Sequence, residues 1–193
     1  MAAISLLVSV RHARCMKHQH LILTGIPASG KSTIGRALSN ALGLEMWDKD
    51  DILEDLFNEK GIGDLHWRSV LSRAADEILI NHVCQSDGSV VVSWWRHPAS
   101  SLASGTPIEW LSELRGSLVE VNCVCDPVVA AERFKSRTRH SGHQDQSRAY
   151  EELLTTFQQQ AALGPLGIGR LITVNTEGEV KIEDLLHKIG SLA

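Results

Sequence analysis

A single glycine-rich segment constrains the fold of this chain more than any other feature of its sequence. Residues 25–32 match the pattern G-x-x-x-x-G-K-[ST], after the apolar run 21–24 and before a helical pattern that begins at Ser32. Glycines let successive backbone N–H groups in such a loop converge on an anion, and the N-terminus of the following helix adds a positive field. The segment therefore predicts a strand, a phosphate-binding loop and a helix, in that order.

This loop predicts a nucleotide site. We expect ATP to contact the residues Gly25, Ile26, Pro27, Ala28, Ser29, Gly30, Lys31, Ser32 and Thr33. Lys31 would reach the β- and γ-phosphates, and the Ser32 hydroxyl would hold Mg²⁺. ATP and Mg²⁺ are thus the expected cofactors.

The size and charge of the chain limit its class. Its 193 residues suit one α/β domain, which we place at residues 19–193. The net charge of −4 provides no field that would attract a polyanion, so general nucleic-acid binding is disfavoured. No run approaches the roughly 18 apolar residues of a membrane-spanning helix. We therefore expect no membrane partner. The chain is expected to be a monomer or a homodimer.

The first 18 residues are interpreted as a loose leader, with Met16 as an alternative start. The apolar run 2–10 has no basic residue before it and Arg11, His12 and Arg14 after it, which is the wrong order for a secretory signal. The alternative is that this leader packs on the domain as an extra strand.

The four cysteines indicate a reducing compartment. They stand at positions 15, 84, 123 and 125 without C-x-x-C spacing, and Cys123 and Cys125 lie in an apolar run typical of a buried strand. A cytoplasmic location is therefore expected.

Apolar runs alternate with helical patterns along the chain. Strands are expected at residues 21–24, 44–47, 89–93, 118–124 and 171–174. Helices are expected at 32–42 and 64–83, from Asp126-Pro127 onward, and from about Glu179 through Leu185-Leu186. This alternation predicts a mainly parallel sheet covered on both faces.

Two acidic residues end the second predicted strand. Asp48 and Asp50 would lie at the carboxyl edge of the sheet, where ligands bind in open parallel sheets. A carboxylate there can order Mg²⁺-bound water or accept the proton of an attacking hydroxyl. If the chain is still extended, both side chains point to the same face. Asp51 is expected to cap the next helix.

The stretch from residue 25 to 50 resembles the opening of shikimate kinase, and gluconate kinase shares the same plan. It reads G-x-x-x-x-G-K-S-T-I-G-R-x-L and then A-L-G-L-x-x-x-D-x-D. The resemblance implies a P-loop NTPase fold with a five-stranded sheet and a mobile lid. It also implies that Asp48 positions Mg²⁺ and Asp50 contacts the acceptor hydroxyl. Arg68 is a match for the family arginine that holds the substrate carboxylate, with a solvated helix face as the alternative.

The chain departs from that family after the third predicted strand. Shikimate kinases have a Gly-Gly-Gly turn there, whereas this chain has Ser93-Trp94-Trp95-Arg96-His97-Pro98, so an acceptor other than shikimate is expected. Trp94 or Trp95 with Arg96 would form a wall of the acceptor site. The strand also lacks the terminal acidic residue of a Walker B motif, so Mg²⁺ would depend on Ser32 and Asp48.

A basic cluster follows the helix that begins at Asp126. Arg137-Thr138-Arg139-His140-Ser141-Gly142-His143 is loosely similar to the lid of gluconate kinase, and we place the lid at about residues 137–147. Phosphoryl transfer needs cations around the transferred group, and Arg137 and Arg139 are expected to supply them. The alternatives are a solvated basic loop or a metal site on His140, His143 and Asp145.

These observations predict an ATP-dependent kinase that phosphorylates a hydroxyl of a small polar metabolite, of the sugar-acid or hydroxy-acid class. Lys31, Asp50, Arg137 and Arg139 are the expected catalytic residues. A polynucleotide 5′-hydroxyl kinase is the alternative within the fold, and a non-catalytic nucleotide sensor is the alternative outside enzymes.

Overall fold

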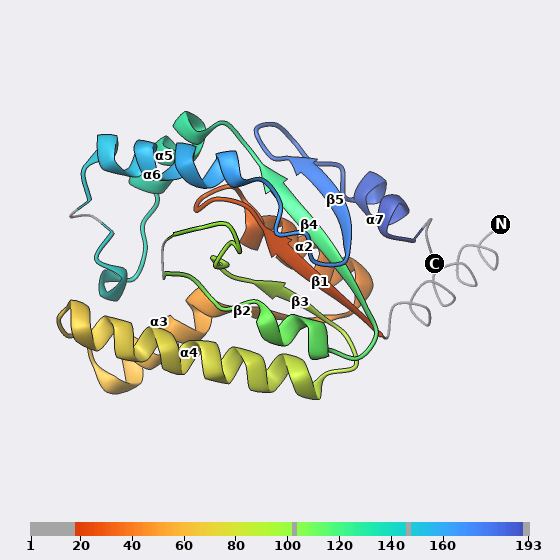
Figure 1. Cartoon of the computed structure of the whole chain (residues 1–193), viewed down its shortest axis with the longest axis horizontal. Coiled ribbons are helices and arrows are strands. Elements are labelled where there is room, and N and C mark those ends of the chain that lie inside the picture. The colour runs from red at the N-terminus through yellow and green to blue at the C-terminus, as the bar shows by residue number, and fades with distance from the viewer. Residues whose placement is uncertain (1–17, 102–103, 146–147, 191–193) are drawn as a thin grey trace.

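Five parallel strands form the centre of the protein in a computed structural model (Figure 1). The structure describes residues 18–101, 104–145 and 148–190, so the predicted leader lies outside the described part except for its last residue. The strands are β1 (Gln19–Thr24), β2 (Glu45–Asp48), β3 (Ser89–Val92), β4 (Ser117–Val124) and β5 (Arg170–Asn175), in the order β2-β3-β1-β4-β5. The predicted α/β fold with a five-stranded parallel sheet is confirmed.

Helices and short 3-10 turns connect these strands. They are α2 (Lys31–Leu42), α3 (Lys49–Lys60), α4 (Leu65–Gln85), η1 (Glu109–Glu113), α5 (Pro127–Ser136), η2 (Ser141–His143), α6 (Tyr150–Leu163) and α7 (Ile182–Gly190). Asp126 caps α5 as predicted, and the closing helix begins at Ile182, three residues later than expected. No helix among the described residues is long and apolar enough to cross a membrane.

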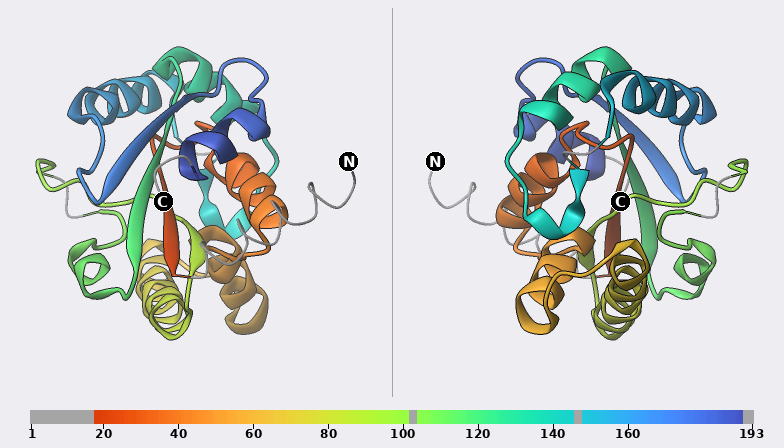
Figure 2. Two further views of the ribbon diagram at one scale, coloured as in Figure 1. Left: turned by 90° about the vertical axis from the view of Figure 1, so that its right-hand side faces the viewer. Right: turned by 90° about the vertical axis from the view of Figure 1, so that its left-hand side faces the viewer.

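The alternation of side chains along the strands gives the sheet two apolar faces. Leu21 and Leu23 of β1 are fully buried on the face that α2 and α7 cover (Figure 2). Ile22 points to the opposite face and packs in the cluster that contains Leu79 of α4 and Trp95. The sheet is thus covered on both sides, which holds the carboxyl ends of its strands at one edge.

Loops rather than a helix complete the second face near β4. Glu120, at the middle of β4, is completely buried. Its carboxylate accepts hydrogen bonds from the backbone N–H groups of Leu166, Gly167 and Ile168, at 2.7, 2.9 and 3.2 Å, and from Thr24 Oγ1 at 2.9 Å. Four donors thus offset the cost of removing this carboxylate from water, and they fix the loop between α6 and β5 on the sheet.

The segment that follows α5 connects the two ends of the molecule. Helices α5 and α6 lie together at one end, whereas α3 and α4 lie at the other (Figure 1). After Ser136 the chain runs back toward α3, and η2 comes to lie against that helix (Figures 1 and 2). This brings the predicted lid over the carboxyl edge of the sheet.

Replacing Glu120 with alanine should destabilise the protein, because three backbone N–H groups and the Thr24 hydroxyl would lose their acceptor. We expect the free energy of unfolding in urea to fall by about 3 kcal/mol. Glu132→Ala removes an exposed carboxylate from α5 and should change it by less than about 0.5 kcal/mol. Equal losses in the two variants would contradict the anchoring role of Glu120.

Candidate active site

The phosphate-binding loop has the predicted context between β1 and α2. Gly25 has φ +125°, and a Cβ atom there would overlap the carbonyl oxygen of Cys123, so the position requires glycine. Gly30 also has positive φ, at +87°, and precedes the first residue of α2. Ala28 adopts φ +60°, a conformation that few non-glycine residues take. The backbone is therefore held in the tight curve that an anion-binding loop needs.

Lys31 is folded back onto this loop. Its Nζ donates to the carbonyl oxygens of Gly25 at 2.8 Å and Ile26 at 2.7 Å, and the residue is 8% exposed. Burial lowers the pKa of Lys31, although Asp50 and Asp48 act in the opposite direction. Two carbonyl oxygens thus hold the ammonium group, within reach of an anion in the loop.

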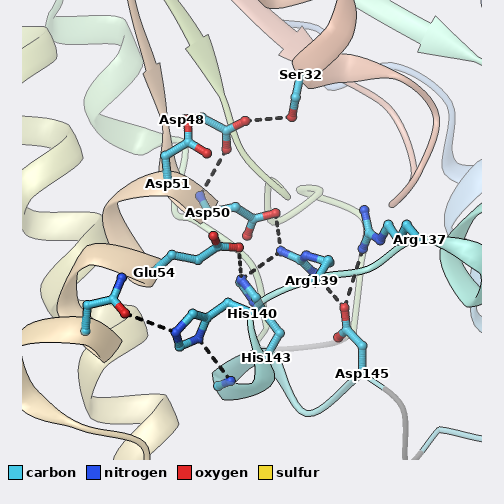
Figure 3. Close-up of polar contacts among 12 residues, drawn as sticks. Ser32, Asp48, Asp50, Asp51, Glu54, Arg137, Arg139, His140, His143 and Asp145 are labelled. Carbon is cyan, nitrogen blue, oxygen red and sulfur yellow. Dashed lines mark hydrogen bonds and ion pairs between the residues drawn. The ribbon is translucent and has the colours of Figure 1, made fainter.

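Asp48 joins β2 to both neighbouring helices. Its Oδ2 accepts a hydrogen bond of 2.6 Å from Ser32 Oγ, and its Oδ1 accepts one of 3.0 Å from the Asp50 backbone N–H (Figure 3). Asp48 is therefore the N-cap of α3, and the prediction that Asp51 caps this helix is wrong. Asp51 instead forms an exposed ion pair with Arg36 at 3.4 Å. Burial, followed by the charge of Asp50, raises the pKa of Asp48 to about 6.

Asp50 lies in the first turn of α3, so the chain is no longer extended there. The expectation that Asp48 and Asp50 project to one face of an extended chain is wrong, because the helix begins at Lys49. Asp50 pairs with Arg139 at 2.5 Å (Figure 3). Burial would raise its pKa, but the charge of Arg139, followed by His143, Arg137 and Lys31, outweighs this effect and lowers it. Asp50 is thus held as a carboxylate.

The two lid arginines share one acidic partner. Asp145 Oδ2 lies 2.7 Å from Arg139 and 3.5 Å from Arg137 (Figure 3). Arg139 consequently bridges Asp145 in the lid and Asp50 in α3. Burial opposes its charge, but the two carboxylates prevail and raise its pKa. The predicted lid residues therefore converge on the predicted acceptor aspartate.

Aromatic and polar contacts dock the lid on α3. The ring of His140 stacks on Phe57 with centroids 5.4 Å apart, and His143 meets the same ring edge-on at 5.6 Å. Gly142 lies so close to Phe57 that a Cβ atom would overlap the ring. His143 Nε2 is 2.9 Å from Glu54 (Figure 3). Gly142 and His143 are thus buried where the lid meets α3, and residues 146–147 of the predicted lid lie outside the described part.

A cavity of about 690 Å³ unites these groups. The predicted residues that line it include Pro27, Ala28, Gly30, Lys31, Ser32, Thr33, Asp48, Asp50, Arg68, Trp94, Arg137 and Arg139. The lining also includes residues that were not predicted for the site, among them Arg133, Arg148, Thr176, Gly178, Glu179 and Val180. Residues 176–180 follow β5 at the same edge of the sheet. Their place directly after a predicted strand is the sequence signal that could have identified these residues as part of the site.

Part of the set predicted for the acceptor wall lines this cavity. Arg68 and Trp94 line the cavity, and Arg68 Nε is buried without a hydrogen-bond partner among the described residues. Trp95 instead belongs to the core and is 4% exposed. Arg96 is absent from the described lining, and its guanidinium lies 3.5 Å from the carbonyl oxygen of Gly105.

Comparisons with known proteins agree with this geometry. A profile of an AAA domain family matches residues 21–154. A shikimate kinase of Bacillus cytotoxicus is 24% identical over 179 residues, which cover 89% of this chain and 98% of the relative. These similarities confirm the resemblance stated from the sequence, and the relatives are small-molecule kinases, as predicted for this chain.

Solved structures share the fold. A presumptive kinase from Chloroflexus aurantiacus has a TM-score of 0.73 at 23% identity, over 90% of this chain and 97% of that one. A shikimate kinase from Bacteroides thetaiotaomicron has a TM-score of 0.56 at 19% identity, again over 90% and 97%. The P-loop kinase fold predicted from the sequence is thus confirmed.

Asp48 should make the stability of the protein depend on pH. Because its pKa is about 6 in the folded state and near 3.9 in an unfolded chain, the folded state holds this proton more tightly. The free energy of unfolding should therefore fall as the pH rises from about 4 to about 6. Asp48→Asn should remove this loss and be more stable than the wild type by about 1–3 kcal/mol at pH 7.5, with little difference at pH 4.

Urea unfolding at the two pH values measures this effect. Asp51→Asn is the matched control, because the Asp51 side chain is 60% exposed and joins only a surface ion pair. A stabilisation by Asp48→Asn that is the same at both pH values would show that the ionisation of Asp48 is not the cause.

Proposed function

The chain belongs to the AAA domain family, and we propose that it transfers the γ-phosphoryl group of ATP to a hydroxyl of a small polar metabolite. The supporting observation is that one cavity contains the phosphate loop, the Ser32–Asp48 pair and the Asp50–Arg139 pair. The acceptor would be a sugar acid or a hydroxy acid, and the reaction would take place in the cytoplasm.

Residues of the loop and of β2 would bind ATP and its metal ion. The backbone N–H groups of the loop would surround the phosphates, and Lys31 would exchange its two carbonyl partners for phosphate oxygens. Ser32 and Asp48 bring a hydroxyl and a carboxylate oxygen to within 2.6 Å of each other, and oxygen donors of this kind suit Mg²⁺. When bound by these two residues, Mg²⁺ would neutralise charge on the β- and γ-phosphates.

Asp50 would receive the acceptor hydroxyl. The cationic side chains around it keep it ionised, so it can accept the proton of the attacking oxygen. Its present partner, Arg139, must release at least part of this contact when the acceptor binds. Arg68 has a buried N–H without a partner among the described residues, and it would bind an anionic group of the acceptor against the indole of Trp94.

The lid would complete the site. Arg137 and Arg139 are tied to Asp145, so both guanidinium groups move with the lid. Turned toward the γ-phosphate, they would stabilise the charge that develops during transfer, and the closed lid would exclude water. The Phe57 contacts of His140 and His143 would hold that closed position.

Acceptor-dependent release of ADP tests the proposed reaction. A panel of sugar acids and hydroxy acids is offered to the protein with Mg²⁺ and ATP, and at least one member should raise ADP release well above the rate without acceptor. Lys31→Ala is the control, since it should fold and yet lose this activity. Slow hydrolysis that no acceptor changes would contradict the kinase and favour the nucleotide sensor.

Substitution of Asp48 and of Asp50 should change different kinetic parameters. Asp48→Asn should raise the Mg²⁺ concentration needed for half-maximal rate, and excess Mg²⁺ should restore part of the activity. Asp50→Asn should leave the binding of Mg²⁺ and ATP intact and lower turnover by roughly 10²–10⁴-fold, as expected for the loss of a general base. Titration of Mg²⁺ and ATP against both variants measures this difference. A metal defect in Asp50→Asn alone would reverse the two roles.

A further inference from the structure

A second cavity, of about 220 Å³, lies where the phosphate loop begins. Thr24, Gly25 and Ile26 line this second cavity. Loop residues from Pro27 onward line the main cavity instead. Trp94 is the residue that lines both. The described lining of the second cavity contains no Asp, Glu, Lys or Arg side chain, in contrast to the strongly charged main cavity. A phosphate or a carboxylate would therefore lack a charged partner there.

Fixed loops form the walls of this second cavity. Glu120 binds the backbone of residues 166–168, and His97 Nε2 lies 3.1 Å from the carbonyl oxygen of Pro165. Trp95, which also lines the cavity, donates its indole N–H to the carbonyl oxygen of Leu23 at 2.9 Å. Because hydrogen bonds within the protein hold these walls, the cavity is preformed.

One polar group of the second cavity is available to a ligand. Asn122 is 7% exposed and lines the cavity, and its Oδ1 lies 3.3 Å from Thr24 Oγ1. Among the hydrogen bonds of the described residues, Asn122 takes part through Oδ1 and not through its amide nitrogen. The amide N–H groups can therefore donate to an acceptor atom of a ligand in the cavity. The indoles of Trp94 and Trp95 offer flat apolar surfaces beside it.

We propose that the second cavity binds a small uncharged ring compound that carries a hydrogen-bond acceptor, and that this binding changes the affinity of the protein for ATP. The ring would lie beside the two tryptophans, and its acceptor would bind the Asn122 amide. The volume is below the 300–1,000 Å³ that is usual for drug-sized ligands, so the ligand is a single ring or a small bicycle.

The phosphate loop provides the connection to ATP. Gly25 and Ile26 line the second cavity, and their carbonyl oxygens are the acceptors that hold Lys31 Nζ in the main cavity. A ligand that shifts these carbonyls changes how readily Lys31 turns to the phosphates. By linkage, ATP must then change the affinity for the ring compound by the same factor. This coupling rests on the proposed ATP site, whereas the ring-binding site itself does not.

Nicotinamide is a suitable probe, because it is planar, uncharged and carries a carbonyl acceptor. Calorimetric titration of the full chain should give a dissociation constant in the millimolar range, as expected for a ligand with so few atoms. Nicotinate has the same ring with a carboxylate, and it should bind about tenfold more weakly, because no charged side chain faces it. Benzamide extends the test to a second neutral ring.

A pair of variants of neighbouring residues locates the site. Ala161 is an exposed residue near the end of α6 and lines the second cavity. Ala161→Phe places a ring there and should raise the dissociation constant of nicotinamide about tenfold. Ala162→Phe makes the same change at the next exposed residue, which is outside the described lining, and it should bind like the wild type. Both variants should keep the melting temperature of the wild type. Saturating nicotinamide should change the dissociation constant of ATP about threefold or more in the wild type and not in Ala161→Phe.

Several results would overturn this proposal. The site is wrong if neither nicotinamide nor benzamide binds, if nicotinate binds equally well, or if the two alanine variants bind alike. Binding with an unchanged ATP affinity would overturn the coupling alone. A protein that binds nicotinamide but lacks acceptor-dependent ADP release would contradict the proposed kinase and leave the ring site standing, so the two failures are distinguishable.

Discussion

The contact between Ser32 and Asp48 holds three elements of the site in register. Ser32 belongs to the first turn of α2, whereas Asp48 ends β2 and caps α3 with its other oxygen. The carboxylate therefore fixes the start of α3, and with it Asp50, relative to the phosphate loop. Burial raises the pKa of Asp48 to about 6, so the free protein is less stable when this group is ionised. A bound cation would relieve that cost, which couples metal binding to the local fold.

Charge balance explains why the lid lies against α3. The cavity brings Lys31, Arg137 and Arg139 close to Asp48 and Asp50, and unpaired charges are costly in such a place. Arg139 and Asp50 neutralise each other, and Asp145 supports Arg139 from the lid. The same charges that would stabilise phosphoryl transfer thus provide the attraction that holds the lid against α3.

The fold and many residues of the candidate site could be predicted from the sequence. The G-x-x-x-x-G-K-S pattern, the alternation of runs and the Asp126-Pro127 start depend on local conformation, and all of them are confirmed. Helix α6 was not assigned, since its sequence shows neither a strong cap nor a clear start. The cap of α3 was assigned to Asp51 because all three nearby aspartates suit an N-terminus, and only the tertiary contact with Ser32 selects Asp48.

Other features arise from residues that are far apart in the sequence. The sequence could not show that Glu120 would be buried, because its four donors come from β1 and from a loop 46 to 48 residues later. Nor could it separate Trp94, which lines both cavities, from Trp95, which packs in the core and lines only the second cavity. Leu166, in the loop held by Glu120, lines the second cavity together with Trp94. A carboxylate buried in the sheet therefore fixes part of the lining of this cavity, which connects the packing of β4 to the choice of ligand at the carboxyl edge.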